Sequence, residues 1–165
     1  MDVLDKLVNV ELNWSLLKGI GLVLHAFDNN NELAVLIIQG VFSSKAEGRF
    51  GQNSWKFKRA GLLQNNISIT EGDSNQETAM FKKKGLGGIL TMKDGKSYLI
   101  ERNALMTEYK LLSNQEPVIK YIFDQHSKFF LQPASVGLQH LPLLLVFLPY
   151  LIIMQRIDYK SAIPF

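Results

Sequence analysis

Large apolar and basic side chains alternate along residues 55–61. In an extended chain, Trp55 and Phe57 point to one side, and Lys56 and Lys58 point to the other. Because successive side chains of a strand lie on opposite faces, this period of two predicts a half-buried β-strand. Further short apolar stretches follow at intervals of about ten residues: NNISIT, TAMFKKKG, GGILTM, SYLIER, TEYKLL and VIKYIF.

Polar turn sequences separate these stretches: EGDSNQE, KDGK and SNQEP. Asp94 and Gly95 predict a tight hairpin turn of a primed type, since glycine adopts the positive φ that such a turn needs. Several short strands joined by turns of this kind favour an all-β sandwich or barrel.

The chain before Trp55 is more hydrophobic than the part that follows. Two long apolar runs, LLKGIGLVLHAF and LAVLIIQGVF, flank a turn predicted at DNNNE. The next segment, SSKAEGRFGQNS, is predicted to be a loop. The opening DVLDKLV fits a short helix or a strand, and that choice stays open. Since no linker rich in Pro, Gly or Ser divides the chain, the sequence predicts a single domain over residues 1–165.

The segment LPLLLVFLPYLIIM, from Leu141 to Met154, has no alternation and is rich in Leu, which predicts a helix. We expect the helix to begin near Pro133, because the missing N–H of proline costs nothing in a first turn. We expect it to end near Arg156, a cation suited to a helix C-terminus. The prediction is a core helix at about residues 134–156. Being apolar on every side, it must be surrounded by lipid or by protein.

The length of this segment favours protein as its surroundings. Fourteen residues rise about 21 Å as a helix, whereas the hydrocarbon of a bilayer is roughly 30 Å thick. A longer span would include Gln139 and His140, and Pro149 removes a backbone hydrogen bond. Burial of some dozen large apolar side chains contributes on the order of 20 kcal/mol. A buried core helix is the favoured interpretation, and a membrane-inserting tail anchor is the alternative that remains.

Composition places the chain among ordinary globular proteins. Hydrophobic residues make up 47% and charged residues 20% of it. The absence of cysteine excludes a disulfide scaffold, thiolate zinc sites and cysteine nucleophiles. The N-terminal segment has Asp2 and Asp5 where a signal peptide would carry positive charge. We therefore expect a cytoplasmic protein, with peripheral association at a membrane as a further expectation.

The hairpins of residues 55–123, followed by one wholly apolar C-terminal helix, resemble the tubby C-terminal-like superfamily. This superfamily includes the tubby domain, the LURP-one-related proteins and the phospholipid scramblases. The resemblance implies a mainly β fold, a closed antiparallel barrel of about twelve strands around a buried hydrophobic C-terminal helix. It also implies a binding role, because tubby domains bind phosphoinositide headgroups through basic residues on the barrel. The same resemblance implies an alternative, a scramblase-like protein whose C-terminal helix inserts into a membrane.

Basic residues are concentrated in the middle of the chain, where eleven Lys and Arg stand against six Asp and Glu between Lys45 and Arg102. Three lysines precede a glycine-rich turn in KKKGLGG, a combination that can cradle an anion. Solvated surface charge is the alternative explanation. The candidate ligand-binding residues are Lys82, Lys83 and Lys84, joined by Lys56, Lys58 and Arg59 if the two hairpins are neighbours.

The expected partner of these residues is an anionic lipid or another phosphate-bearing ligand, and a protein partner is also open. Nucleic acid is not expected, since Trp55 and Phe57 alternate to the side opposite the lysines and so point inward.

Residues typical of catalysis form no recognisable constellation. His25, His126 and His140 are far apart and lack metal-ligand spacing. The contiguous segment DQHS contains the residue types of a hydrolytic triad, but adjacent residues on one strand or turn cannot converge. KKKGLGG is not a phosphate-binding loop of the Walker type, because no Gly-Lys-Ser/Thr follows. We expect a non-enzymatic binding module without metal or cofactor; an enzyme that carries no recognisable motif is the remaining alternative.

Overall fold

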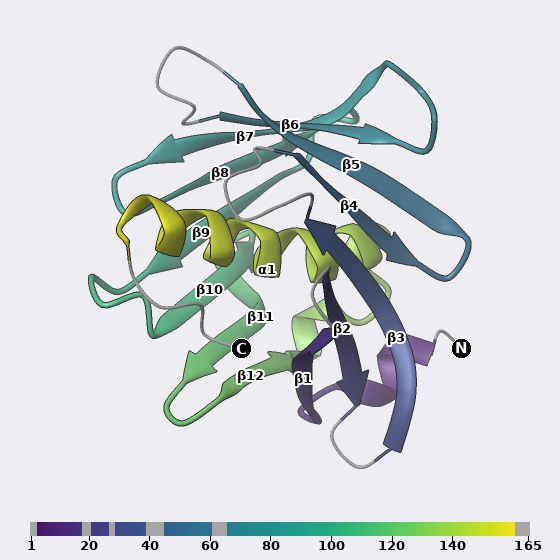
Figure 1. Cartoon of the computed structure of the whole chain (residues 1–165), viewed down its shortest axis with the longest axis vertical. Coiled ribbons are helices and arrows are strands. Elements are labelled where there is room, and N and C mark those ends of the chain that lie inside the picture. Colours follow the sequence, from purple (N-terminus) through teal and green to yellow (C-terminus); the bar gives the residue numbers. More distant parts are fainter. Residues whose placement is uncertain (1–2, 18–20, 27–28, 39–44, 61–65, 161–165) are drawn as a thin grey trace.

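Strands that follow one another in the sequence pair antiparallel, and β1 pairs with β12 to close a barrel (Figure 1). The computed structural model describes residues 3–17, 21–26, 29–38, 45–60 and 66–160. Within these residues the strands are β1 (Glu11–Leu17), β2 (Gly21–Ala26), β3 (Asn29–Ile38), β4 (Lys45–Phe50), β5 (Asn53–Ala60), β6 (Asn66–Glu71), β7 (Glu77–Lys84), β8 (Gly87–Met92), β9 (Ser97–Arg102), β10 (Glu108–Ser113), β11 (Glu116–Phe123) and β12 (Ser127–Leu131). The 3-10 helices are η1 (Val3–Leu7) and η2 (Pro133–Ser135), and the α-helix is α1 (Leu141–Asp158). The prediction of a closed antiparallel barrel is confirmed.

Helix α1 runs through the interior of the barrel, with strands around it (Figure 1). Of its 18 residues, 15 are buried, on all sides of the helix. By length and composition α1 is also able to cross a membrane, but 83% of it is buried inside the protein. The prediction of a buried hydrophobic C-terminal helix is confirmed.

Inward-facing aromatic residues join the strands to the helix. Phe57 stacks on Tyr150 with ring centroids 5.1 Å apart and meets Phe147 edge-on at 5.9 Å. Phe81 of β7 packs against the same Phe147 at 5.6 Å. Trp55 and Phe57 are both buried, as the alternation in β5 predicts, and Lys56 and Lys58 are exposed.

The helix begins later than expected. Pro133 starts the short helix η2, and α1 starts at Leu141 rather than near residue 134. A continuous helix is impossible here, because Val136 is extended and Gly137 has a φ of +73°. The proline in the first turn of α1 is Pro142. At the other end, α1 extends to Asp158, two residues beyond Arg156.

Two predictions for the N-terminal part are wrong. The segment SSKAEGRFGQNS, residues 43–54, contains β4 rather than a continuous loop, and Asn29 to Glu32 of the turn predicted at DNNNE lie within β3. The apolar run LLKGIGLVLHAF contains the end of β1, at Leu17, and the whole of β2, which begins at Gly21. Residues 18–20 and 27–28, which join β1 to β2 and β2 to β3, lie outside the described residues. The undecided opening is the 3-10 helix η1.

Primed turn geometry occurs at a different hairpin from the one predicted. Gly95 has a φ of +92°, but Asp94 is not in the left-handed region, and the Gly95 N–H donates to the Met92 carbonyl. This is an ordinary turn followed by a left-handed glycine. The turn between β10 and β11 has positive φ at both Asn114 and Gln115, 50° and 69°, which is the primed pattern without a glycine.

We predict that Gly48→Ala destabilises the barrel by about 1–3 kcal/mol, the usual cost of overpacking. Gly48 lies on the inner wall of β4, where an added Cβ would be 2.8 Å from Cγ2 of Val146 and 3.0 Å from Cε2 of Phe57. Urea unfolding measures the change. In the background of Val146→Ala, which removes the obstructing methyl groups, the same substitution is expected to cost less. Equal costs in the two backgrounds would contradict the close approach.

We also predict that a chain ending at residue 140 does not fold. Without α1, the inward face of the strands, including Phe57 and Phe81, has no apolar partner. The measurement is the amount of monodisperse protein without detergent and the presence of a cooperative unfolding transition. Recovery of a cooperatively folded, soluble truncated chain would instead favour a helix that can leave the barrel and insert into a membrane.

Candidate functional site

The outer wall of β4, β5 and β6 carries a basic groove with a volume of about 570 Å³. Lys45, Lys56 and Lys58 line it, and they alternate with the buried Ala46 and Phe57 of the inner wall. Lys45 and Lys58 occupy directly facing positions of the antiparallel pair β4–β5. Like charges at facing positions repel one another. The two ammonium groups thus concentrate positive charge at one end of the groove.

Polar groups complete the lining of this basic groove. Thr70 of β6 offers a hydroxyl group and Asn75 an amide, whereas the Ser68 hydroxyl already donates to Oε2 of Glu77 at 3.1 Å. Ser68 faces Lys58 across the β5–β6 pair, so lysine and hydroxyl lie beside each other on the outer wall. Phosphate and carboxylate oxygens accept hydrogen bonds from hydroxyl and amide donors and from the lysines beside them.

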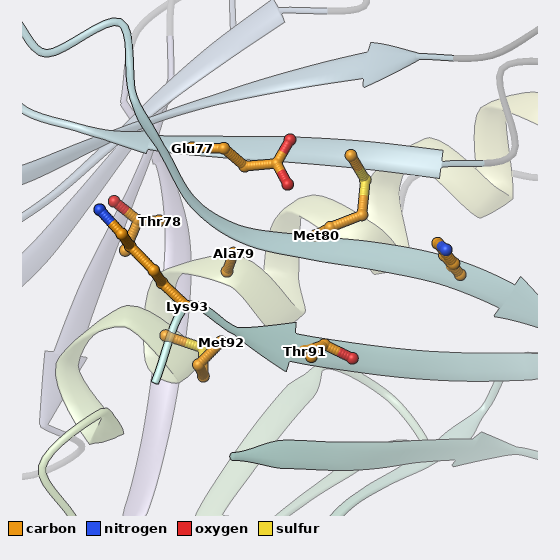
Figure 2. A pocket seen from close by; sticks show the side chains of 8 residues that line it. Glu77, Thr78, Ala79, Met80, Thr91, Met92 and Lys93 are labelled. Atoms are coloured by element: carbon orange, nitrogen blue, oxygen red, sulfur yellow. The ribbon is translucent and has the colours of Figure 1, made fainter. Parts of the chain in front are cut away.

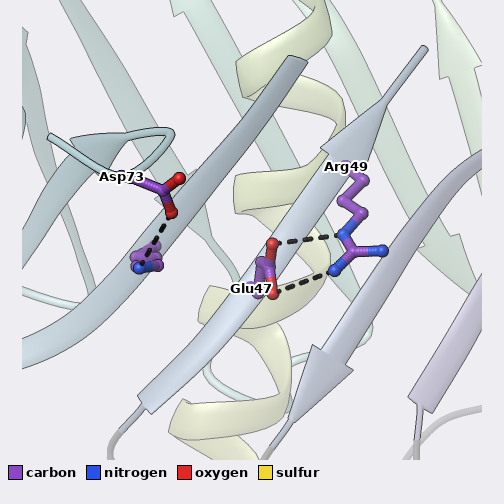
Figure 3. Close-up of polar contacts among 4 residues, drawn as sticks. Glu47, Arg49 and Asp73 are labelled. Atoms are coloured by element: carbon purple, nitrogen blue, oxygen red, sulfur yellow. Dashed lines mark hydrogen bonds and ion pairs between the residues drawn. The ribbon is translucent and has the colours of Figure 1, made fainter. Parts of the chain in front are cut away.

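The carboxylates near the groove are engaged by neighbouring cations (Figure 3). Glu47 accepts hydrogen bonds from Nε and a terminal nitrogen of Arg49, at 3.1 and 3.3 Å. Asp73 lies 3.8 Å from Nζ of Lys56 and is fully exposed, so this ion pair is weak. An anionic ligand therefore faces little competition from Glu47 and displaces only a weak contact of Lys56.

The structure separates the six predicted site residues. Lys56 and Lys58 lie in the basic groove. Arg59 follows Trp55 and Phe57 on the inner side of β5, where its guanidinium group donates to Asp158 at the end of α1, at 2.9 Å. Arg59 thus ties strand to helix and does not belong to the outer lysine surface.

The three consecutive lysines of β7 also diverge, because neighbouring residues of a strand face opposite sides. Lys82 lines a second groove of about 420 Å³ with Glu77, Met80 and Thr91 (Figure 2). Nζ of Lys83 lies on the other side, 5.8 Å from the centre of the Tyr159 ring. The two hairpins are neighbours through the β6–β7 pair. With β6 between them, side chains of β5 and β7 are roughly 10 Å apart, and the six residues do not converge on one point.

Lys45 is the residue of the groove that the sequence interpretation missed. It lies in the segment read as a loop, yet Lys45, Glu47 and Arg49 alternate there with Ala46, Gly48 and Phe50. The alternation was present, but its inward residues are mostly small.

Two buried tyrosines of the strands form hydrogen bonds within the core. The Tyr109 hydroxyl donates to Oε1 of Gln155 in α1, and the Tyr121 hydroxyl lies 3.3 Å from Oγ of Ser127. Burial raises the pKa of Tyr109 and of Tyr121, so both hydroxyls stay protonated at neutral pH. They act as hydrogen-bonding groups of the core.

At the opposite end of α1, His140 is coupled to the β8–β9 turn. Its Nε2 lies 2.8 Å from Oδ2 of Asp94, and Oδ1 of Asp94 accepts a hydrogen bond from the Lys96 N–H at 2.9 Å. These two hydrogen bonds lower the pKa of Asp94. Among the described residues no three His, Asp or Glu side chains are placed to hold a metal ion.

Comparisons with known proteins identify no relative: no protein-family model, no curated protein and no solved structure matches the chain. The resemblance to the tubby C-terminal-like superfamily therefore stays a prediction.

We predict that Asp94→Asn destabilises the protein at pH 7 and loses this effect in acid. A carboxylate whose pKa is lowered by folding contributes stability above the ordinary aspartate value of about 3.9. That contribution disappears as the pH falls through the lower, folded-state pKa of Asp94. Urea unfolding of both proteins at pH 7 and at about pH 2.5 measures this contribution.

Asp73→Asn serves as the control, since its exposed ion pair contributes little. A deficit of Asp94→Asn that is equal at both pH values contradicts the pairing.

Proposed function

We propose that this protein is a non-enzymatic binding module that takes a phosphate-bearing ligand in the basic groove of β4, β5 and β6. The observation that supports the proposal is the facing pair of Lys45 and Lys58 above a groove lined by hydroxyl groups. The chemistry recognised is a multiply charged phosphate, which both a lipid headgroup and a soluble polyphosphate carry.

The facing lysines favour an anion for a physical reason. In the antiparallel pair their Cβ atoms are about 5 Å apart, so one anion can lie within reach of both ammonium groups. A phosphate group at this position can accept a charge-assisted hydrogen bond from each lysine. Thr70 lines the same groove, and its hydroxyl can donate a further hydrogen bond.

The expected location in the cytoplasm, peripheral to a membrane, stays part of this proposal. A groove that binds phosphate by exposed lysines is sensitive to ionic strength, because screening at physiological salt acts over about 8 Å. Binding is thus expected to be strongest where the phosphate groups are concentrated, as they are on an anionic lipid surface.

The test uses tripolyphosphate as the probe and isothermal titration calorimetry as the measurement. We expect Lys45→Ala with Lys58→Ala to weaken binding by at least about tenfold, which corresponds to 1.4 kcal/mol. The matched control is Lys110→Ala with Lys120→Ala, which removes the other facing lysine pair, between β10 and β11. The control is expected to change affinity by less than about twofold. An equal loss in both variants would show that net charge alone attracts the probe and would overturn the groove as the site.

A further inference from the structure

The end of the barrel where α1 ends lies at the left of Figure 1, and two turns at this end carry exposed leucines at their tips. The β7–β8 turn, the β9–β10 loop and the end of α1 lie together there, since Lys83 and Arg102 both lie against Tyr159. Leu86 is 46%, Leu105 77% and Tyr159 53% exposed. We call this end the C-terminal rim, defined by residues 82–87, 102–107 and 156–159.

The turns at the other end of the barrel show what is usual. They consist of polar residues and glycine: Gly51-Gln52 between β4 and β5, residues 72–76 between β6 and β7, residues 93–96 between β8 and β9, and Asn114-Gln115 between β10 and β11. Turn positions favour such residues for conformational reasons. A leucine at the tip of two turns of the C-terminal rim is therefore not explained by turn geometry.

The two leucines are held in place by the fold. Leu86 follows Gly85, whose φ of +61° makes a tight turn between the paired Lys84 and Gly87. Leu105 precedes Met106, which is buried and whose carbonyl accepts a hydrogen bond from Arg156 at 3.0 Å. Both tips are thus presented to the outside by anchored backbone, and their exposure does not depend on a loose loop.

Positive charge surrounds the apolar tips. Nζ of Lys83 and Cζ of Arg102 lie 5.8 and 5.5 Å from the centre of the Tyr159 ring. Lys84 is exposed beside Leu86. Two of the acidic side chains nearby are paired: Asp158 accepts hydrogen bonds from Arg59, and Asp124 lies 3.0 Å from Nζ of Lys128. Glu101 and Glu108, which flank the β9–β10 loop, are exposed.

We propose that the C-terminal rim docks onto an anionic lipid bilayer. Apolar tips on separate turns can enter the boundary between headgroups and acyl chains, and lysines next to them contact lipid phosphates. Tyr159 is the type of residue that lies at the level of the headgroups, with an apolar ring and a polar hydroxyl. Positive charge around the tips complements a bilayer of negative surface potential.

The docked orientation follows from the position of the rim. The end of α1 faces the bilayer, and the helix stays inside the barrel. Lys45 at the start of β4 and Lys58 near the end of β5 lie toward this same end of the barrel, since Arg59 contacts Asp158. The basic groove would then open beside the lipid headgroups. Docking by the rim rests on the leucines and does not require the groove to bind phosphate.

The test measures co-sedimentation of the full chain with phosphatidylcholine vesicles that contain about 30% phosphatidylserine, at about 0.1 M and 0.5 M salt. We expect Leu86→Ser with Leu105→Ser to lower the partition coefficient by at least about tenfold. Tripolyphosphate binding should remain that of the original protein, which separates this proposal from the function of the groove. Lys83→Gln with Lys84→Gln is expected to lower binding at low salt and to reduce its salt dependence.

The matched control is Leu99→Ser, because Leu99 is 39% exposed on the outer wall of β9, away from the rim. It should change the partition coefficient by less than about twofold. Thermal unfolding of each variant confirms that it is folded. Failure of the original protein to bind these vesicles overturns the proposal. So does undiminished binding of the folded double-leucine variant, which would leave the rim leucines as a surface for a protein partner.

Discussion

Helix α1 is apolar on all sides, and it fills a barrel that is wide enough to hold it. Each of the two buries apolar surface of the other that would otherwise be exposed to water. The inner wall fits the helix: Gly48 leaves room where Val146 comes close, and Phe57 and Phe81 both pack against Phe147. Outside the strands and α1, Leu4 of η1 and Met106 of the β9–β10 loop also belong to this core. The closed sheet, the burial of α1 and the outward placement of the lysines all follow from this mutual enclosure.

Much of this architecture can be predicted from the sequence, because alternation fixes which side chains of a strand face inward. It identified Trp55 and Phe57 as core, and the length of the apolar segment favoured protein over lipid around α1. The missed strand, β4, has inward residues that are small because the helix passes close by, so hydrophobicity alone could not reveal it. The start of α1 depended on the left-handed Gly137, and sequence alone does not give φ.

The candidate site was only partly predictable for a related reason. The lysines of β5 could be placed on the outer wall, and Arg59 could have been assigned to the inner side from the same alternation. Which lysine faces which depends on the pairing of β4 with β5, and this is a property of the closed sheet. The two ends of the barrel also differ in chemistry: polar turns and the His140–Asp94 pair lie at one end, and the two leucine-tipped turns lie at the other, beside the polar β11–β12 turn.

The position of α1 in the chain affects how the protein is made. All twelve described strands precede the helix that fills them, so a chain leaving the ribosome has synthesised residues 1–140 before its central element appears. At 5–20 residues per second this interval is roughly 7–28 s. During it, the nascent sheet exposes its apolar face and an unclosed edge, the condition in which chaperones protect growing chains. Completion of the last helix converts a chain at risk of aggregation into a folded domain.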